Sequence, residues 1–187
     1  VRESLAFDTK LAMYKKLGYD GVQLHDDDAV PNLNDMTAAE IEAAAKALKA
    51  KLDSHGLFAE FVAPRLWFDP RTIDGGFTNN CPKCRAFAME RFKKTVDIAQ
   101  ALGTNLVVLW LAREGTYIRE AKDSAVAVER IAAAIDEILQ YCPNIKIAIE
   151  PKPNEPMDHA YIPTTGHAIA LGMLTSDPSR VGVNIES

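Results

Sequence analysis

The sequence predicts an α/β protein whose parallel sheet closes into a (β/α)8 barrel, with about strands 2 to 6 of that barrel in this chain. Short apolar runs alternate with amphipathic helices along the chain, which is typical of a parallel sheet covered by helices. Four of the five runs also end in a polar or aromatic residue. Such residues are expected where the βα-loops build a site at one face of a barrel.

An open, doubly wound sheet is the alternative fold for this alternation. No glycine-rich phosphate-binding sequence follows any of the predicted strands, so the nucleotide-binding form of that fold has no support. We therefore predict one catalytic barrel domain over residues 1–187. Because a barrel needs eight strands, and the chain runs only from Val1 to Ser187, we expect this domain to be partial and truncated at both ends.

Local signals set the boundaries of the predicted elements. Thr37 and Glu40 have the spacing of a capping box, in which each side chain satisfies a backbone N–H of the other residue. Gly56 suits the positive φ that often ends a helix, and Pro82 suits the first turn of the next one. The predicted helices cover residues 8–17, 37–55, 82–102, 119–141 and 165–175. The predicted strands cover residues 19–24, 57–62, 105–110, 145–149 and 180–185.

Composition and charge exclude several classes of protein. The chain is 48% apolar and 25% charged, which argues against disorder. Its net charge of −5 disfavours electrostatic binding to nucleic acid or to an anionic membrane. No apolar run approaches the roughly 18 residues that a membrane span needs. Three cysteines without a visible signal peptide favour a cytoplasmic protein.

Cys81 and Cys84 have the spacing of half a zinc site or of a redox pair. No second CxxC or His pair follows at a suitable distance, and the two residues follow a polar turn rather than a strand. We therefore interpret them as two ordinary thiols at the start of a helix.

His25 ends the first predicted strand and is followed by three aspartates, the last of them Asp28. An Asp three positions after a His can fix the imidazole tautomer and raise its basicity, which makes a general base near neutral pH. Acidic residues also serve in βα-loops as helix caps and turn formers. The spacing alone leaves both interpretations open.

The segment after the fourth strand begins with Glu150 and Lys152 and contains three prolines, which hold the backbone extended. Such rigid support suits a metal-binding carboxylate and a cationic electrophile, although an exposed loop with solvated charges is the alternative. Glu186 places a second carboxylate after the next strand. The alternative interpretation is that Glu186 is conspicuous only because it lies next to the end of the chain. Two converging carboxylates repel each other unless a cation lies between them, and all-oxygen ligands suit Mg²⁺ or Mn²⁺.

Two aromatic residues are candidates for a substrate wall. Trp110 ends an aliphatic strand, where it either covers the core or presents a flat surface to a sugar ring. Phe77 follows two glycines on a predicted loop, where an apolar aromatic side chain is unusual and suggests a role in binding. Neither residue decides the function alone.

Together these motifs resemble the xylose isomerase family, in its shorter actinobacterial-like class. The resemblance runs in the same order from about residue 8 to the end of the chain. Its most specific segment is Glu-Pro-Lys-Pro-Asn-Glu-Pro at residues 150–156. Other matching segments are His-Asp-Asp-Asp at 25–28, Asp-Gly-Gly-Phe-Thr-Asn at 74–79, Trp110 with Arg-Glu-Gly at 113–115, Pro-Thr-Thr-Gly-His-Ala at 163–168, and Val-Gly-Val-Asn-Ile-Glu at 181–186.

The resemblance implies a metal-dependent aldose–ketose isomerase that converts D-xylose to D-xylulose and also glucose to fructose. Such an enzyme opens the sugar ring and moves a hydride from C2 to C1 between two divalent cations, which are Mg²⁺, Mn²⁺ or Co²⁺. By motif match, His25 would promote ring opening while Asp28 orients its imidazole. Lys152 would hydrogen-bond the carbonyl oxygen of the open-chain sugar.

The resemblance also implies the metal and substrate contacts. Glu150 would bind one cation and Glu186 would bridge both, with Glu155 behind them in a supporting position. Trp110 and Phe77 would wall the sugar pocket. The family implies a homotetramer, or dimers within one, that acts on small aldoses and ketoses.

Two other functions stay open from the sequence. The first is a sugar epimerase or isomerase of the same barrel superfamily that uses one metal and proton transfer, in which Lys152 would have no obvious task. The second is an inactive metal-binding fragment of a barrel.

Overall fold

The computed structural model describes residues 5–154 and 156–185. Its centre is a five-stranded parallel sheet in the order β1-β2-β3-β5-β7. The strands are β1 (Gly21–His25), β2 (Phe58–Ala63), β3 (Leu106–Trp110), β5 (Lys146–Glu150) and β7 (Val181–Val183). This sheet follows the order of the chain without reversal, whereas a doubly wound sheet reverses its order at a switch point. The predicted barrel fold is therefore confirmed, and the open alternative is not.

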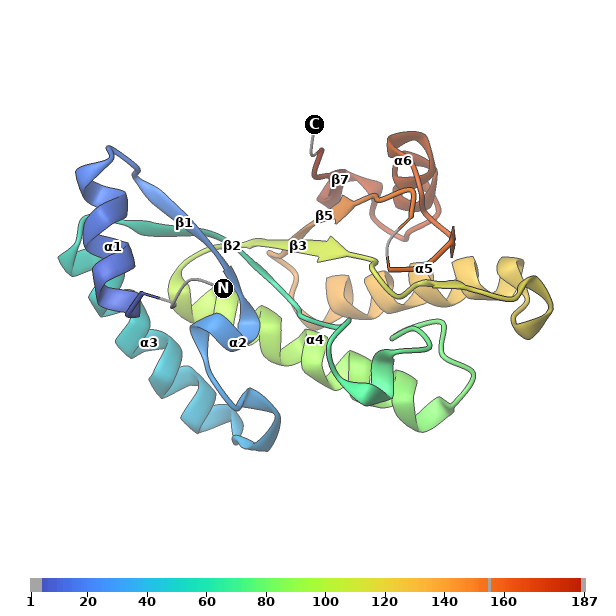
Figure 1. Cartoon of the computed structure of the whole chain (residues 1–187), viewed down its shortest axis with the longest axis horizontal. Helices are drawn as coiled ribbons and strands as arrows, with labels where there is room; N and C mark the ends of the chain where they lie inside the picture. The colour runs from blue at the N-terminus through green and yellow to red at the C-terminus, as the bar shows by residue number, and fades with distance from the viewer. Residues whose placement is uncertain (1–4, 155, 186–187) are drawn as a thin grey trace.

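Among the described residues, five of the six α-helices correspond to predicted ones, and the short helix α2 (Asp26–Ala29) was not predicted. The other helices are α1 (Phe7–Lys16), α3 (Ala38–Ser54), α4 (Pro82–Leu102), α5 (Ser124–Tyr141) and α6 (Thr165–Met173). Helices α3, α4 and α5 run along one side of the sheet (Figure 1). Short 3₁₀ turns lie at Leu33–Asp35, Pro70–Thr72, Arg119–Ala121 and Pro178–Arg180.

One helix starts later than predicted. The helix expected at 119–141 begins at Ser124, because the Asp123 carboxylate accepts hydrogen bonds from the backbone N–H groups of Ala125 and Val126 at 2.9 and 3.2 Å. These bonds satisfy the free N–H groups of the first turn, so Asp123 is the N-cap. In contrast, the capping box at α3 forms as predicted: Glu40 accepts from the N–H of Thr37 at 2.7 Å, and Thr37 accepts from the N–H of Glu40 at 3.3 Å.

A second, two-stranded antiparallel sheet was not predicted. It pairs β4 (Gly115–Thr116) with β6 (His159–Ala160) and ties the loop after β3 to the loop after β5. Each strand has two residues, which is too short for a hydropathy pattern to reveal. At Gly115 a Cβ would lie 2.6 Å from the carbonyl oxygen of His159, so this close approach requires glycine.

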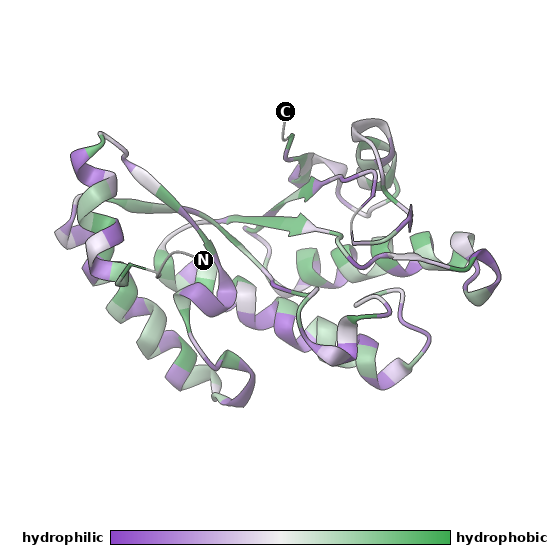
Figure 2. Cartoon of the chain, viewed as in Figure 1, coloured by the Kyte–Doolittle hydropathy of each residue, from purple (hydrophilic) through white to green (hydrophobic). Residues whose placement is uncertain are grey.

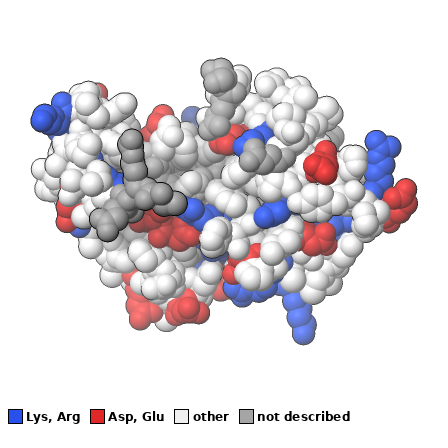
Figure 3. All heavy atoms as spheres, viewed as in Figure 1, with Lys and Arg blue, Asp and Glu red and all other residues white. Residues whose placement is uncertain are grey.

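The core lies between the sheet and its helices. Apolar residues (green) concentrate on the strands, while the helices carry both apolar and polar residues (Figure 2). The fully buried side chains include Phe92 of α4, Leu109 of β3, and Ile131 and Ile138 of α5. On the face drawn in Figure 3, acidic and basic side chains are interspersed. No helix within residues 5–154 and 156–185 combines the length and the hydropathy of a transmembrane segment.

Strand register brings the chemically interesting residues to one edge of the sheet. Trp110 at the end of β3 lies opposite Glu150 at the end of β5. His25 at the end of β1 lies opposite Ala63 at the end of β2. The carboxyl ends of parallel strands meet at the same edge, which is where barrel enzymes place their sites.

Candidate functional site

A pocket of about 410 Å³ opens at the carboxyl ends of β1, β2, β3 and β5. Four residues predicted from the sequence line it, namely His25, Trp110, Glu150 and Lys152. The remaining lining residues are Gln23, Leu24, Phe61, Ala63, Trp67 and Val108. The fold therefore gathers an imidazole from the end of β1 and a carboxylate and an ammonium group from the end of β5 and the loop that follows it.

A larger cavity of about 710 Å³ lies over the loops after β1 and β2, and Asp28 and Arg65 are among its lining residues. Glu150 and Lys152 do not line it. We take the smaller pocket as the candidate site because the strand-end imidazole, carboxylate and ammonium groups meet there.

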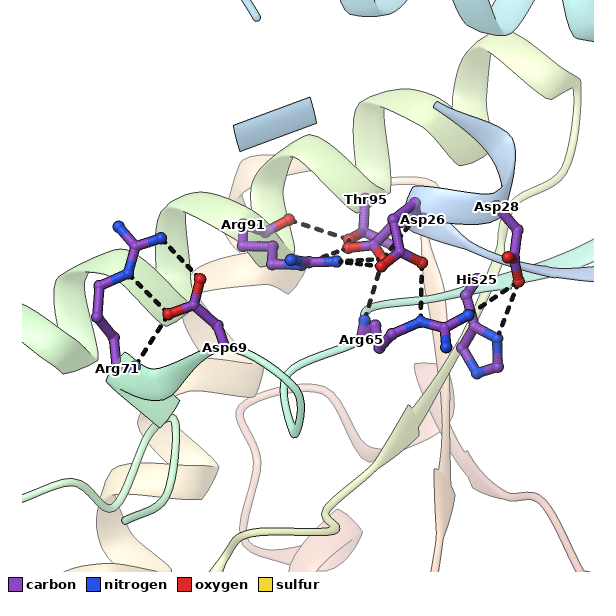
Figure 4. Close-up of polar contacts among 9 residues, drawn as sticks. His25, Asp26, Asp28, Arg65, Asp69, Arg71, Arg91 and Thr95 are labelled. Atoms are coloured by element: carbon purple, nitrogen blue, oxygen red, sulfur yellow. Dashed lines mark hydrogen bonds and ion pairs between the residues drawn. The ribbon is translucent and has the colours of Figure 1, made fainter. Parts of the chain in front are cut away.

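The predicted contact between His25 and Asp28 is present. His25 Nδ1 lies 3.3 Å from Asp28 Oδ2, and both side chains are partly exposed. The guanidinium of Arg65 donates to the same carboxylate oxygen through Nη2 at 3.0 Å (Figure 4). The carboxylate of Asp28 is thus held by a cation on one side and is available to the imidazole on the other.

Arg65 is a site residue that the sequence analysis missed. It follows β2, and its Nε donates to Asp27 Oδ1 at 2.8 Å while its Nη2 reaches Asp28. Its backbone N–H also donates to Asp26 Oδ1 at 3.1 Å. The partners lie 37 to 39 residues away in the chain, so no local spacing could have revealed this contact.

Asp26 is fully buried and has a structural task. It accepts hydrogen bonds from Nε and Nη2 of Arg91 at 2.8 and 2.7 Å and from Thr95 Oγ1 at 3.2 Å, as drawn in Figure 4. Burial alone would lower the pKa of Arg91, but the hydrogen bonds and charge of Asp26 outweigh that effect and raise it. This pair fastens the loop after β1 to α4. The aspartates at 26 and 28 therefore do different work.

Two tryptophans form an aromatic wall beside the imidazole. The rings of Trp67 and Trp110 meet edge to face with centroids 4.5 Å apart, and the ring of His25 lies 5.2 Å from that of Trp67. Lys152 Nζ lies 5.1 Å from the ring of Trp110, within the range of a cation–π contact. Trp67 was not predicted as a site residue. The signal that could have found it is an aromatic residue in the loop directly after a strand end.

Phe77 does not lie at the pocket wall, which corrects the expectation for this residue. Its side chain is 2% exposed and packs against Phe92 in the core, with ring centroids 5.8 Å apart. Its loop is drawn inward by Glu114, whose buried carboxylate accepts from the backbone N–H groups of residues 76, 77 and 78 at 2.9 to 3.0 Å. Trp67 occupies the wall instead.

Glu150 and Lys152 both line the pocket, as their spacing on an extended segment predicts. Asn184, one residue beyond β7, donates from Nδ2 to Glu150 Oε2 at 2.9 Å, which orients the carboxylate. Glu155 and Glu186, the other predicted carboxylates, lie outside the described residues.

The oxygen chemistry of Glu150 suits a hard divalent cation, but the described residues supply an incomplete set of ligands. Within residues 5–154 and 156–185, no group of three His, Cys, Asp or Glu side chains is close enough to hold a metal ion. Among the described residues that line the pocket, Glu150 is the one carboxylate, and Asn184 orients it.

A parallel sheet in sequential order, with a pocket of charged and aromatic residues at the carboxyl ends of its strands, defines an α/β barrel protein with a barrel-type site. The chain belongs to the family described as xylose isomerase-like TIM barrel, whose sequence profile matches residues 11–187.

Solved structures of similar fold agree with this family. A D-psicose 3-epimerase, solved in the presence of D-fructose, has a TM-score of 0.68 at 17% identity, over 96% of this chain and 57% of its own. A 3-keto-D-glucoside 4-epimerase from E. coli has a TM-score of 0.70 at 13% identity, over 96% of this chain and 65% of its own. A xylose isomerase-like TIM barrel protein from Mycobacterium smegmatis, in complex with magnesium, has a TM-score of 0.59 at 18% identity, over 96% of this chain and 56% of its own. The chain thus spans less than two thirds of each of these proteins.

Proposed function

We propose that the protein to which this chain belongs is a metal-dependent aldose–ketose isomerase, converting D-xylose to D-xylulose and glucose to fructose by ring opening and a 1,2-hydride shift. The observation that carries the proposal is the meeting of Lys152, His25 and an aromatic wall in one pocket, with Asp28 in contact with the His25 imidazole from beside it. Its substrates are small aldoses and ketoses, and we propose a homotetramer or dimer of the full-length chain.

His25 is the proposed base for ring opening. Because Asp28 lies against Nδ1, the Nδ1–H tautomer is favoured and Nε2 is left to accept a proton from the anomeric hydroxyl of the sugar. Arg65 keeps the Asp28 carboxylate in place through its bond to Oδ2. The pair therefore acts before the isomerisation step, on the closed ring.

Lys152 is the proposed electrophile for the open-chain sugar. Its ammonium group lines the same pocket as His25 and would donate a hydrogen bond to the carbonyl oxygen, where negative charge develops as the hydride moves. Trp67 and Trp110 would limit the access of water to the reacting carbons. A carbon-bound hydrogen that moves with its electron pair then has no opportunity to exchange with solvent.

Glu150, and by family resemblance Glu186 as the bridging ligand, would hold the two divalent cations, with Glu155 in support. When bound, these cations supply Lewis-acid polarisation of the sugar oxygens. The neighbouring epimerase folds and the magnesium-bound neighbour support a divalent cation and a sugar substrate as a class.

An epimerase that uses proton transfer is the second candidate, favoured by the similarity to the two epimerase folds. That chemistry needs acid and base groups on both faces of one carbon. Lys152 lines the pocket and would have a task in the hydride shift but none in proton transfer, while the contact of His25 with Asp28 suits ring opening. These features favour the isomerase.

The test uses the full-length protein with Mg²⁺ or Mn²⁺ and D-xylose carrying deuterium at C2. We expect the product ketose to retain the deuterium at C1, as followed by NMR. Complete loss of the label to water would show proton transfer and would replace this proposal by the alternative, a sugar epimerase or isomerase that uses proton transfer. Absence of any sugar conversion, despite metal binding by calorimetry, would favour the inactive metal-binding barrel.

The role of Lys152 is tested by Lys152→Met, with Lys146→Met as the matched control. Lys146 is exposed at the start of β5, the strand that Lys152 follows, and lies at the opposite edge of the sheet from the pocket. We expect kcat to fall by about 10²-fold or more in Lys152→Met, the size seen when a group that stabilises developing charge is removed. Lys146→Met should keep normal kcat. Equal activity of both variants would refute the role of Lys152.

A further inference from the structure

Cys81 and Cys84 lie at the start of α4, outside the pocket and without a task in the proposed function. The N–H of Cys84 donates to the carbonyl oxygen of Cys81 at 3.1 Å, which closes a single turn. Turns of this type hold the Cα atoms of residues i and i+3 within about 7 Å of each other. That separation overlaps the range of about 4.4–6.8 Å between the Cα atoms of disulfides. The backbone thus holds the Cα atoms of Cys81 and Cys84 within the range of separations that a disulfide spans.

The two sulfurs differ in environment. Cys81 is exposed, and the backbone N–H groups of Cys84 and then Lys83 stabilise its thiolate, which lowers the pKa of the Cys81 thiol. Burial raises the pKa of the Cys84 thiol, and the neighbouring sulfur of Cys81 adds to that effect. Because the thiolate is the nucleophile, Cys81 is the cysteine that attacks first.

The surroundings keep Cys81 in this position. Its N–H donates to Asn79 Oδ1 at 2.9 Å, and the Asn79 side chain is tied in turn to the carbonyl oxygen of Gly75 at 3.0 Å. Pro82 occupies the first turn of a helix of 21 residues, whose N-terminus carries the positive end of the helix dipole. A thiolate at this position is stabilised by a fixed backbone.

We propose that Cys81 and Cys84 form a redox-active dithiol that exchanges with low-molecular-weight disulfides. The Cys81 thiolate attacks one sulfur of the small disulfide, so that a mixed disulfide forms and one small thiolate leaves. Cys84 then loses its proton to solvent and attacks Cys81 Sγ, which forms the intramolecular disulfide and releases the second small thiolate. Two protein thiols are oxidised and one small disulfide is reduced to two thiols. This assignment revises the interpretation of the pair as ordinary thiols.

The test uses oxidised glutathione with the full chain, followed by intact mass spectrometry and peptide mapping. The unsubstituted protein should lose two hydrogens and carry no lasting glutathione adduct. Cys84→Ser should trap a stable adduct on Cys81, because the second attack is no longer possible. The reaction of Cys81→Ser with oxidised glutathione should be slower than that of the unsubstituted protein by at least about tenfold, because the remaining Cys84 is the poorer nucleophile. Cys142→Ser is the matched control and should behave as the unsubstituted protein does.

A second measurement separates thiolate chemistry from simple exposure. The rate of alkylation by iodoacetamide should reach its half-maximum at a lower pH in Cys84→Ser than in Cys81→Ser, in the order of the two pKa shifts. Lasting adducts on both cysteines of the unsubstituted protein would overturn the proposal. So would equal half-maximum pH values in the two variants.

Discussion

Trp67 and Trp110 meet edge to face, with their ring centroids 4.5 Å apart and their planes inclined by 62°. Trp110 ends β3, whereas Trp67 lies in the loop after β2, four residues beyond the strand. Two neighbouring parallel strands thus place one indole each over the same pocket. This contact builds an apolar wall of two inclined rings next to the imidazole of His25.

Trp67→Ala should lower kcat/KM for sugar isomerisation by about tenfold, because an aromatic pair contributes about 0.5–1.5 kcal/mol and its loss also admits water to the pocket. Trp67→Phe should recover most of the activity. Phe68→Ala is the control, since Phe68 is 77% exposed and does not line this pocket. Steady-state kinetics on the full-length protein would contradict the wall if Trp67→Ala matched the control.

Asp26→Asn should destabilise the protein by about 3–5 kcal/mol, because it leaves the buried charge of Arg91 with only its longer ion pair to Asp27 at 3.4 Å. The measurement is urea unfolding followed by circular dichroism. Asp53→Asn removes the exposed ion pair with Lys49 on α3 and should cost only about 0.3–0.5 kcal/mol. Similar decreases in the free energy of unfolding of the two variants would mean that the buried Asp26–Arg91 pair contributes no more to stability than an exposed ion pair.

Glu114→Gln should cost about 1–3 kcal/mol of stability, because the amide replaces one carboxylate oxygen by a donor that faces other donors. The loop that carries Phe77 should then become easier to cleave by protease. Glu120→Gln is a matched control on the exposed surface of the following segment. An unchanged unfolding midpoint in Glu114→Gln would contradict the role of the carboxylate in closing the loop.

Asn184→Leu should weaken the binding of Mn²⁺ to the full-length protein by about 10–100-fold, the usual cost of losing a group that orients a metal ligand. The hydrogen bond to Glu150 Oε2 is the reason, because without it the carboxylate is free to turn away from the pocket. Asn144→Leu, at an exposed position, should bind Mn²⁺ normally in calorimetry. Removal of metal by a chelator should abolish sugar conversion in all variants.

Tyr141 should make the stability of the protein fall at high pH. Burial, together with the hydrogen bond to Asp97, raises the pKa of Tyr141 to about 12 in the folded protein, against an ordinary value of about 10. Above the ordinary value the unfolded chain loses the phenolic proton while the folded chain keeps it, so stability falls as the pH rises from about 10 toward 12.

Tyr141→Phe isolates this contribution, because phenylalanine has no phenolic proton. The difference in free energy of unfolding between the unsubstituted protein and Tyr141→Phe should be constant below pH 9 and should shift in favour of the variant above pH 10. Urea titrations at several pH values measure it. A difference that does not change with pH would mean that Tyr141 titrates alike in both states.

Much of the fold follows from local patterns in the chain. The alternation of apolar runs with helices predicted each strand of the main sheet, because nearly continuous apolar runs between helices are typical of parallel strands. The capping box at Thr37 and the proline start of α4 were equally local signals. The pair of two-residue strands escaped prediction, since it depends on the meeting of two distant loops.

The site was predictable where its residues end strands. His25, Trp110 and Glu150 lie in the pocket because the carboxyl ends of parallel strands share one edge, so their place follows from the fold class. Lys152 follows for the same reason, because its spacing from Glu150 on an extended segment gives both the same side.

The sequence by itself therefore determined the order of the strands and the strand-end residues, because these depend on periodicity and on contacts between near neighbours. Its motifs led as far as the xylose isomerase-like TIM barrel family as a class. Only the tertiary structure decided that Trp67 rather than Phe77 forms the wall, and that Arg65 holds Asp28. The physical reason is that loop side chains take their direction from partners far along the chain. The buried carboxylate of Glu114 turns Phe77 inward, and the carboxylates after β1 hold Arg65, over separations of 37 and 38 residues.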